Sequence, residues 1–373
     1  MKSLDVNRLL DNIEQVAQYD LSNNKVFGSA YLVYQDGVML EKCYGTISLS
    51  GNEKVTNTSI FRLASMTKPI TAVAALILVE RGLLSLDDTV DQYLPAFKDI
   101  KIQDMSGNAV APQKMPTIRN VLSHASGIGS APEKIALMRP EDRKTIDATI
   151  AFYLRNGLDF EPECTQWYSG SGAFDVLTKI IEIVSQMDYL SFLQKELFTP
   201  CEMRDTTFTP TPEQQSRMVA MHNRCDGENA VFQMQEGCIF ESYPCTHYLG
   251  GAGLVSTLKD YGNFCKMLLN NGATETTRIL QEETLKLLHT PQLLEGMSLK
   301  AKERWGLGVR VITGEDYPYL PIGCYGWSGA YGSHFWVDPE NKLFAVYMKN
   351  SKFDGGAANE SARNLEQVVY TSF

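Results

Sequence analysis

A serine and a lysine three residues apart are the first pair in this sequence that could perform catalysis. Ser65 and Lys68 precede an apolar run with helical spacing. Residues three apart lie on one face of a helix, so the Lys68 amine can approach the Ser65 hydroxyl. Serine needs a neighbouring base to become a nucleophile, and lysine acts as one only when burial or another cation lowers its pKa. A helix start at Ser65 would also aim a free backbone N–H at a developing oxyanion.

Two later segments could supply the groups that this pair lacks. Tyr168 lies on a predicted loop before a helix, where a phenol polarised by a nearby ammonium could shuttle the proton of the nucleophile. A turn is predicted at 326–330, just before a strand at 332–337. There Gly329 would let a substrate approach the strand edge, and the Ala330 N–H could be a second oxyanion donor. Each feature taken singly is also typical of an ordinary helix start or turn.

Their order and spacing together resemble the serine β-lactamase and penicillin-binding protein family. Ser65-Met66-Thr67-Lys68 resembles its S-x-x-K motif, Tyr168-Ser169-Gly170 its Y-x-N motif, and Trp327-Ser328-Gly329 occupies the place of K-T-G. Segments 121–127, 198–206 and 251–257 resemble further stretches of the family, and the resemblance covers about residues 25–350. It implies an α+β fold: a mixed antiparallel sheet flanked by terminal helices, with an inserted, mainly helical domain.

Two departures from the family motifs bear on the substrate. Gly170 replaces the usual Asn, so the amide that binds an acylamino group and orients the lysine is missing. Trp327 replaces the Lys of K-T-G, whose contact with a substrate carboxylate is worth roughly 1.5–3 kcal/mol. Tryptophan offers an apolar wall instead. Both departures resemble the family VIII carboxylesterases, which implies neutral esters rather than anionic lactams.

The resemblance therefore implies a serine hydrolase that cleaves small neutral esters through an acyl-enzyme on Ser65. Lys68 and Tyr168 would be the general base and acid, and the N–H groups of Ser65 and Ala330 the oxyanion hole. The substrate-binding positions would be Gly170, Trp327, Ser328 and Gly329. An α/β-hydrolase is disfavoured, because the segment closest to G-x-S-x-G has Ala330 where the last glycine is needed.

Several alternatives stay open at this level. An acyltransferase would use the same acyl-enzyme, whereas amidase, D-peptidase or weak β-lactamase activity would use another substrate, and an inactive binding protein could retain the fold. We expect His124 to tie a loop to neighbouring backbone. Arg310 would either form a surface ion pair or replace the missing cation by pointing into the active site. A larger set of aromatic residues could line a pocket or belong to the core: Trp167, Trp305, Trp336 and Tyr331.

The elements that must position these residues come from both ends of the chain. Segment 4–19 has helical spacing, and a hairpin is predicted from 30–34 and 38–40. Strands at 332–337 and 343–348, then a helix at 359–370, mirror this arrangement. Strands from both ends would form one antiparallel sheet, because isolated hairpins are only marginally stable. This predicts a sheet domain of 1–60 with 251–373, a helical domain of 61–250, and an active site in the cleft between them.

The composition of the chain limits its binding partners and the cellular compartment in which we expect it. The net charge of −10 has the wrong sign for binding nucleic acid. The longest apolar run, 72–79, is far shorter than the roughly 20 residues needed to span a membrane. The charged N-terminus lacks the pattern of a secretory signal, so we expect a cytoplasmic location. The eight cysteines include no C-x-x-C pair, and we expect them to be reduced, mostly buried thiols. Five histidines without ligand spacing indicate neither metal nor cofactor. The predicted partner is a small-molecule ester, and the oligomeric state stays open.

Overall fold

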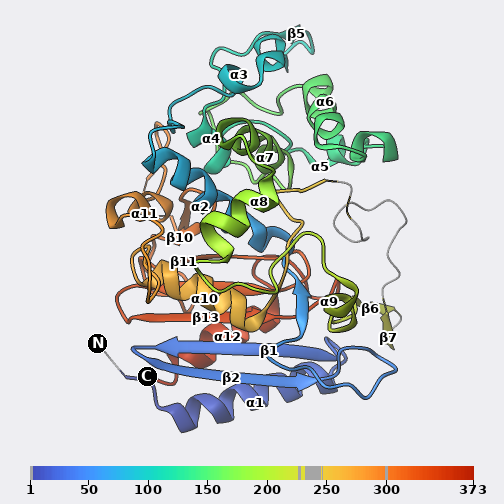
Figure 1. The fold of residues 1–373 in the computed structure, drawn as a ribbon, viewed down its shortest axis with the longest axis vertical. Helices are drawn as coiled ribbons and strands as arrows, with labels where there is room; N and C mark the ends of the chain where they lie inside the picture. Colours follow the sequence, from blue (N-terminus) through green and yellow to red (C-terminus); the bar gives the residue numbers. More distant parts are fainter. Residues whose placement is uncertain (1–2, 226–227, 232–244, 246, 299–300) are drawn as a thin grey trace.

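A seven-stranded sheet built from both ends of the chain is the centre of the computed structural model, which describes residues 3–225, 228–231, 245, 247–298 and 301–373. Its strand order is β2-β1-β13-β12-β11-β10-β9, and every pairing in it is antiparallel. Ala30 of β1 lies opposite Met348 of β13, so the first and last hairpins join edge to edge. The predicted α+β fold is therefore confirmed (Figure 1).

The strands of the sheet are β1 Gly28–Gln35, β2 Val38–Gly45, β9 Glu303–Trp305, β10 Arg310–Ile312, β11 Tyr325–Ser328, β12 His334–Asp338 and β13 Leu343–Met348. Three two-stranded sheets pair β3 Ile60–Arg62 with β8 Val255–Thr257, β4 Ile102–Gln103 with β5 Ala109–Val110, and β6 His222–Cys225 with β7 Glu228–Val231. The α-helices are α1 Val6–Ser22, α2 Thr67–Glu80, α3 Val90–Tyr93, α4 Ile118–Leu122, α5 Pro132–Ile135, α6 Ile146–Asn156, α7 Gly172–Ser185, α8 Tyr189–Leu193, α9 Pro212–Ser216, α10 Leu258–Leu269, α11 Glu282–Leu288 and α12 Glu360–Tyr370. Shorter helical turns are η1 Ala64–Met66, η2 Pro95–Asp99, η3 Pro140–Arg143 and the π-turn η4 Gln194–Phe198.

Both faces of the sheet are covered, and side chains alternate between two cores. On β13, Phe344 and Val346 belong to the large core that contains α10 and α2, whereas Ala345 and Tyr347 face α1 and α12. Successive side chains of a strand point to opposite faces, so a strand buried on both faces must be apolar throughout. This explains the unbroken apolar run of β13. Figure 1 shows α1 and α12 on the outer face and α10 on the other.

The helices at the two ends of the chain begin at side-chain caps. Asp5 accepts a hydrogen bond from the Arg8 N–H at the start of α1, and Asn359 does the same for the Ala362 N–H of α12. Such caps satisfy N–H groups that have no partner within the helix. Both predicted terminal helices are confirmed, and their bounds differ from the predicted ones by no more than three residues.

Helix α2 is the most deeply buried helix of the active-site region. Every residue from Thr67 to Leu78 is buried. Since helices α7 and α11 and the sheet surround it, no polar face is needed, and its run of apolar residues is typical of an enclosed helix. Helix α7 in turn contacts α4, α6 and α8; Figure 1 shows α4, α6 and α7 in the upper part of the molecule and α8 below α7. The proposed division into 1–60 with 251–373 and 61–250 stays a prediction.

The segment around Trp327 differs from its prediction. Residues 326–330 were expected to form a turn, but Trp327 and Ser328 belong to strand β11, and the hairpin turn comes at 329–333. The strand is only four residues long and contains Gly326, so its own residues carry little strand signal. Pairing with β10 and β12 on both sides stabilises it.

Two further predictions concern membrane-spanning helices and the cysteines. No helix in the described part of the chain is both long and apolar enough to cross a membrane. The cysteines whose side chains are described are all free thiols: Cys43, Cys164, Cys201, Cys245, Cys265 and Cys324. Only Cys201, Cys265 and Cys324 of these are buried, fewer than expected.

Candidate active site

Ser65 lies in a short 3₁₀ turn that leads directly into α2. The turn is fixed from both sides, because the Leu63 N–H donates to Leu254 O at 2.9 Å and the Leu254 N–H donates to Thr67 Oγ1 at 3.2 Å. Ala64 has a φ of +45°, a left-handed conformation that costs a non-glycine residue energy and persists only where the surrounding structure holds it. Ser65 is 9% exposed. Its hydroxyl therefore has a fixed position with a small opening to solvent.

The Lys68 amine is held against Ser65 by two backbone carbonyl groups. Its Nζ donates to Gly170 O at 2.6 Å and to Gly251 O at 2.8 Å, and lies 3.2 Å from Ser65 Oγ. The side chain is fully buried. A neutral amine has two N–H groups and one lone pair. Lys68 Nζ also donates to Ser65 Oγ, and an amine that had lost that proton would direct a lone pair at the hydroxyl instead.

Tyr168 completes a hydrogen-bonded group around Ser65. It lies on the predicted loop between α6 and α7, and its hydroxyl donates to Ser65 Oγ at 2.6 Å. The Trp327 indole N–H donates to the same phenol oxygen at 3.2 Å. Lys68 Nζ lies 5.0 Å from the centre of the Tyr168 ring, and Trp305 stacks on that ring at 5.6 Å. Trp327 is therefore a hydrogen-bond donor to the phenol, and its role as an apolar wall for the substrate stays a prediction.

The two backbone N–H groups that were predicted to form an oxyanion hole belong to Ser65 and Ala330, and that role stays a prediction. Ser65 is in the first turn of its helix, where N–H groups have no acceptor within the helix. Ala330 is the exposed residue of the otherwise buried β11–β12 turn, and its N–H has no acceptor among the described residues. The structure joins this turn to the nucleophile segment through Gly329, where a Cβ would lie only 2.4 Å from Leu63 O.

Three predicted substrate-binding positions have other contacts than expected. A Cβ on Gly329 would also meet Ser333 Oγ at 2.4 Å, so this glycine makes room for the neighbouring chain and not for a substrate. Gly170 has open space at its Cβ position, and its carbonyl binds Lys68. Ser328 is 2% exposed and hydrogen-bonds to His334 Nδ1 at 2.8 Å. Because Ser328 follows Trp327 on the strand, its side chain points to the opposite face and not to Ser65.

Arg310 also lies on that opposite face. Its guanidinium is within 3.8 Å of Glu366 in α12 and 3.6 Å of Glu303, and lies 5.2 Å from the centre of the Tyr317 ring. The residue is 3% exposed. Both alternatives for Arg310 are therefore wrong: it forms a buried ion pair, and it does not reach Ser65.

His124 ties the Tyr168 loop to the helical part of the protein, as expected. Its Nδ1 accepts a hydrogen bond from the Ser169 N–H at 3.1 Å, and its ring packs against Trp305 at 4.2 Å. Burial, reinforced by the positive charge of Lys68, holds the pKa of His124 well below its usual value. His124 is therefore neutral and acts by positioning the loop.

The other aromatic residues that could line a pocket lie in different parts of the structure. Trp305 lies beside Tyr168 and Trp327. Trp167 is 61% exposed, Trp336 packs in the core under α1 and α12, and Tyr331 packs on Ala64. Only Trp305 of these four belongs to the aromatic group around Tyr168.

Two residues near Lys68 were not singled out from the sequence. Gly251 lies in a segment noted for its resemblance to the family, but nothing local indicates that its carbonyl would bind a lysine 183 residues away. Asp175 is a carboxyl group 1% exposed on α7, one turn after the Tyr168 loop. An acidic residue within the otherwise apolar stretch 173–177 was the available signal.

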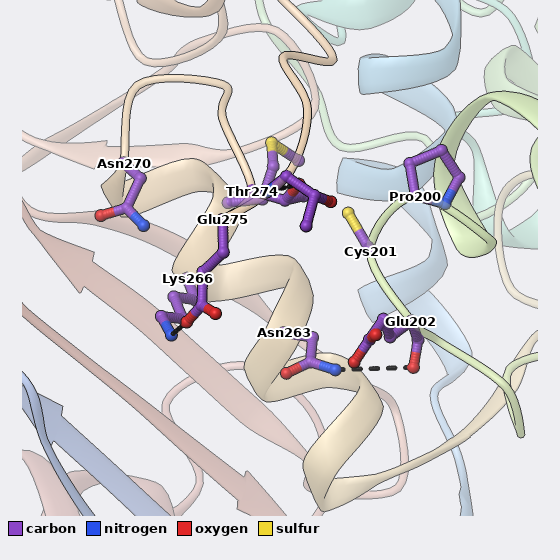
Figure 2. A pocket seen from close by; sticks show the side chains of 10 residues that line it. Pro200, Cys201, Glu202, Asn263, Lys266, Asn270, Thr274 and Glu275 are labelled. Carbon is purple, nitrogen blue, oxygen red and sulfur yellow. Dashed lines mark hydrogen bonds and ion pairs between the residues drawn. The ribbon is translucent and has the colours of Figure 1, made fainter.

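A separate small pocket lies between α10 and the segment after η4 (Figure 2). Its residues include Cys201, Glu202 and Asn263, and Lys266 pairs with Glu275 at 2.6 Å. The pocket shares no residue with the group around Ser65. Its one lysine already has a carboxylate partner, so it offers no unpaired charge to an anionic ligand.

Comparison with known proteins identifies one family, a relative similar in sequence and two solved structures with the same fold. The family model described as Beta-lactamase matches residues 10–370. Esterase EstB of Burkholderia gladioli is 24% identical over 382 residues, which cover 95% of this chain and 93% of EstB. The solved structure of EstCE1, described as a hydrolase with promiscuous acyltransferase activity, has a TM-score of 0.84 at 22% identity and covers 98% of this chain and 99% of its own. Simvastatin synthase LovD of Aspergillus terreus has a TM-score of 0.82 at 19% identity, with 98% of each chain covered. These structures have the same fold as this chain.

Proposed function

The chain belongs to the beta-lactamase family, and from that premise we propose that it hydrolyses small neutral carboxylic esters through an acyl-enzyme on Ser65. The observation that carries this proposal is the contact of one serine hydroxyl with two proton-transfer groups, Tyr168 at 2.6 Å and Lys68 at 3.2 Å. A serine hydroxyl becomes a nucleophile when a positioned base can take its proton. The names of the relatives EstB and EstCE1 support the hydrolase assignment.

In the acylation step, Ser65 Oγ forms a bond to the ester carbonyl carbon while its proton passes to the Lys68–Tyr168 pair. The carbonyl oxygen becomes an oxyanion that the N–H groups of Ser65 and Ala330 would stabilise. The bond from the carbonyl carbon to the alkoxy oxygen then breaks. The alkoxy group leaves as an alcohol with the proton returned by the pair.

In the deacylation step, a water molecule attacks the acyl carbon and gives a proton to the same pair. The bond to Ser65 Oγ breaks, and Ser65 regains its proton. The net reaction converts ester and water into carboxylic acid and alcohol. An alcohol in place of water would give a new ester, so acyl transfer is the second candidate, favoured by the EstCE1 and LovD neighbours.

The preference for neutral substrates is argued from the residues beside Tyr168. Trp327 occupies the position at which relatives carry a carboxylate-binding lysine, and its N–H already donates to the phenol. Arg310 lies on the other face of the sheet. A substrate carboxylate would lose its hydration without gaining a cation from either residue.

The test is a panel of p-nitrophenyl acyl esters, nitrocefin and a D-Ala-D-Ala peptide, with wild type and Ser65→Ala. We expect ester turnover that is lost in Ser65→Ala, and one fluorophosphonate adduct on Ser65 by intact-mass and peptide mass spectrometry. Adding a primary alcohol separates hydrolysis from acyl transfer by the ratio of acid to new ester. A label on another serine, or the absence of both labelling and turnover, would contradict the proposal and favour an inactive binding protein.

A further inference from the structure

The loop between β13 and α12, residues 349–359, packs on the β11–β12 turn that carries Ala330. Three donors of this loop bind three carbonyl groups of the turn. They are the Ser351 N–H to Tyr331 O at 2.9 Å, the Gly356 N–H to Gly329 O at 3.2 Å, and the Asn359 side-chain amide to Gly332 O at 3.3 Å. The turn also binds the nucleophile segment, since the Ser333 hydroxyl donates to Leu63 O at 3.4 Å. Hydrogen bonds on both sides of Ala330 therefore fix the orientation of its N–H.

A buried lysine joins the turn to this loop. Lys349 is fully buried, and its Nζ donates to Asp354 Oδ2 at 2.9 Å and to Ser361 Oγ at 3.3 Å. Its side chain passes directly against the turn, because a Cβ on Gly332 would lie only 2.0 Å from Lys349 Cε. A buried ammonium group needs a counter-ion, and Asp354 supplies it. The ion pair therefore ties the loop to the turn.

Asp354 has a backbone conformation that its partners must stabilise. Its φ is +52°, and that of Ala358 in the same loop is +61°. Residues other than glycine keep such angles only where the surrounding structure holds them. The Asp354 carboxylate accepts hydrogen bonds from the Glu360 N–H at 2.7 Å and the Ser361 N–H at 3.2 Å, in the first turn of α12. Those N–H groups have no acceptor within the helix, and the helix start favours a negative charge. Asp354 therefore connects the loop with both the buried lysine and α12.

We propose that Lys349 and Asp354 are positioning residues for the Ala330 N–H. Their ion pair fixes the loop, and the loop holds the turn in the conformation in which this N–H stabilises the oxyanion formed on attack by Ser65. The inference rests on the proposed function, because it requires an acyl-enzyme on Ser65 and Ala330 as an oxyanion donor. Both residues act through the loop, and neither is assigned a contact with the substrate.

The experiment measures kcat and KM for p-nitrophenyl acetate and the rate constant for fluorophosphonate labelling of Ser65. Both reactions develop negative charge on an oxygen that the same N–H would stabilise. In Asp354→Asn and in Lys349→Met we expect kcat and the labelling rate constant to fall together by about 10- to 100-fold, with KM little changed. A displacement of about 1 Å in a catalytic group is enough for a loss of this size. Loss of folded protein alone would lower the labelled fraction and leave the rate constant per labelled serine unchanged.

Asn359→Ser separates the contact with the turn from the stability of α12. Asn359 Oδ1 accepts from the Ala362 N–H at 2.9 Å, and a serine hydroxyl can replace this helix cap. The shorter side chain cannot reach Gly332 O, so one hydrogen bond to the turn is lost. We expect kcat and the labelling rate constant to fall by about 2- to 13-fold, the effect of one neutral hydrogen bond.

Asp142→Asn is the matched control for loss of a buried carboxylate. Asp142 is 5% exposed, accepts from the Arg139 N–H at 3.0 Å and pairs with Arg155 at 3.0 Å, as Asp354 does with a backbone N–H and a cation. It lies on η3, outside the sheet. We expect its kcat and labelling rate constant to stay within about twofold of wild type, since no contact with the β11–β12 turn is removed.

Unchanged kcat and labelling rate constants in the folded Asp354 and Lys349 variants would overturn the inference, as would a change confined to KM. Equal losses in Asp142→Asn would overturn it too, because any broken ion pair would then suffice. If neither variant of the ion pair folds, Asn359→Ser decides the result. A wild-type protein that neither hydrolyses the ester nor takes label on Ser65 would instead overturn the proposed function. The behaviour of wild type therefore distinguishes the two failures.

Discussion

Trp327→Phe isolates one hydrogen bond at the proposed active site. The Trp327 N–H lies 3.2 Å from the Tyr168 oxygen, and the indole ring lies 5.1 Å from the phenol ring, centre to centre. Trp327 is 7% exposed, so water cannot readily replace the lost donor. Phenylalanine keeps an aromatic ring in place and removes only the N–H group and part of the ring volume. The change therefore tests whether the indole assists Tyr168 or only fills space.

The expected size of the effect depends on the charge of the Tyr168 oxygen. A hydrogen bond between neutral groups contributes about 0.5–1.5 kcal/mol, or about 2- to 13-fold in rate. A hydrogen bond to a charged group contributes about 1.5–3 kcal/mol, or about 13- to 160-fold. Tyr168 gains negative charge when it gives its proton to the leaving group. We therefore expect kcat to fall within the second range while KM changes little.

The assay is steady-state hydrolysis of p-nitrophenyl acetate, with folding checked by circular dichroism. Trp305→Phe is the matched control, because Trp305 stacks on Tyr168 at 5.6 Å and its ring contacts are retained by phenylalanine. We expect its kcat to change less than about threefold, as no charge-assisted hydrogen bond to the phenol is removed. Equal losses in both variants, or a Trp327 variant altered only in KM, would refute the role assigned to the indole N–H.

Four other predictions test the same site. Lys68→Met should lower kcat by about 10²–10⁴ in a folded protein, the usual cost of losing a general base; stopped-flow or steady-state turnover near that of wild type would remove Lys68 from the mechanism. Tyr168→Phe keeps the ring and should lower kcat far more than it raises KM, whereas a change in KM alone would make Tyr168 a binding residue. The kcat/KM of wild type for nitrocefin should be several orders of magnitude lower than that for short esters. Trp327→Lys should raise the ratio of the nitrocefin value to the ester value. Comparable kcat/KM for both substrates in wild type would contradict the preference for neutral esters. Since the pKa of His124 is depressed in the folded protein, its contribution to stability is present above pH 6.5 and lost as pH falls below it, by about 1.4 kcal/mol per pH unit. Urea unfolding from pH 7 to 5 should show a weaker pH dependence in His124→Gln, and an unchanged slope would exclude this histidine as a cause.

The sequence by itself determined the elements at both ends of the chain and the group of Ser65, Lys68 and Tyr168. Hydrophobic periodicity is a local property, so the hairpins β1–β2 and β12–β13 and the helices α1 and α12 could be predicted from neighbouring residues alone. The pair Ser65 and Lys68 is also local, because one helical turn brings the two side chains together. Tyr168 could be associated with them only through the order and spacing of the family motifs.

Only the tertiary structure decided what each neighbouring residue contacts. Strand β11 has four residues and is stabilised by its neighbours, so its side-chain alternation could not be predicted from its own pattern. That alternation directs Trp327 toward Tyr168 and Ser328 toward His334. It explains why one predicted substrate-binding residue lies at the site and the next one does not.

The environment of Lys68 likewise depends on chain segments far apart in sequence. Gly170 O and Gly251 O, 102 and 183 residues away, bind the amine through backbone atoms, which every residue possesses and which therefore leave no signal in the amino-acid types. Residue types and spacing thus predicted which side chains meet at Ser65, but the positions of Lys68 and Tyr168 are set by backbone carbonyl groups and a neighbouring indole that only the folded chain brings together.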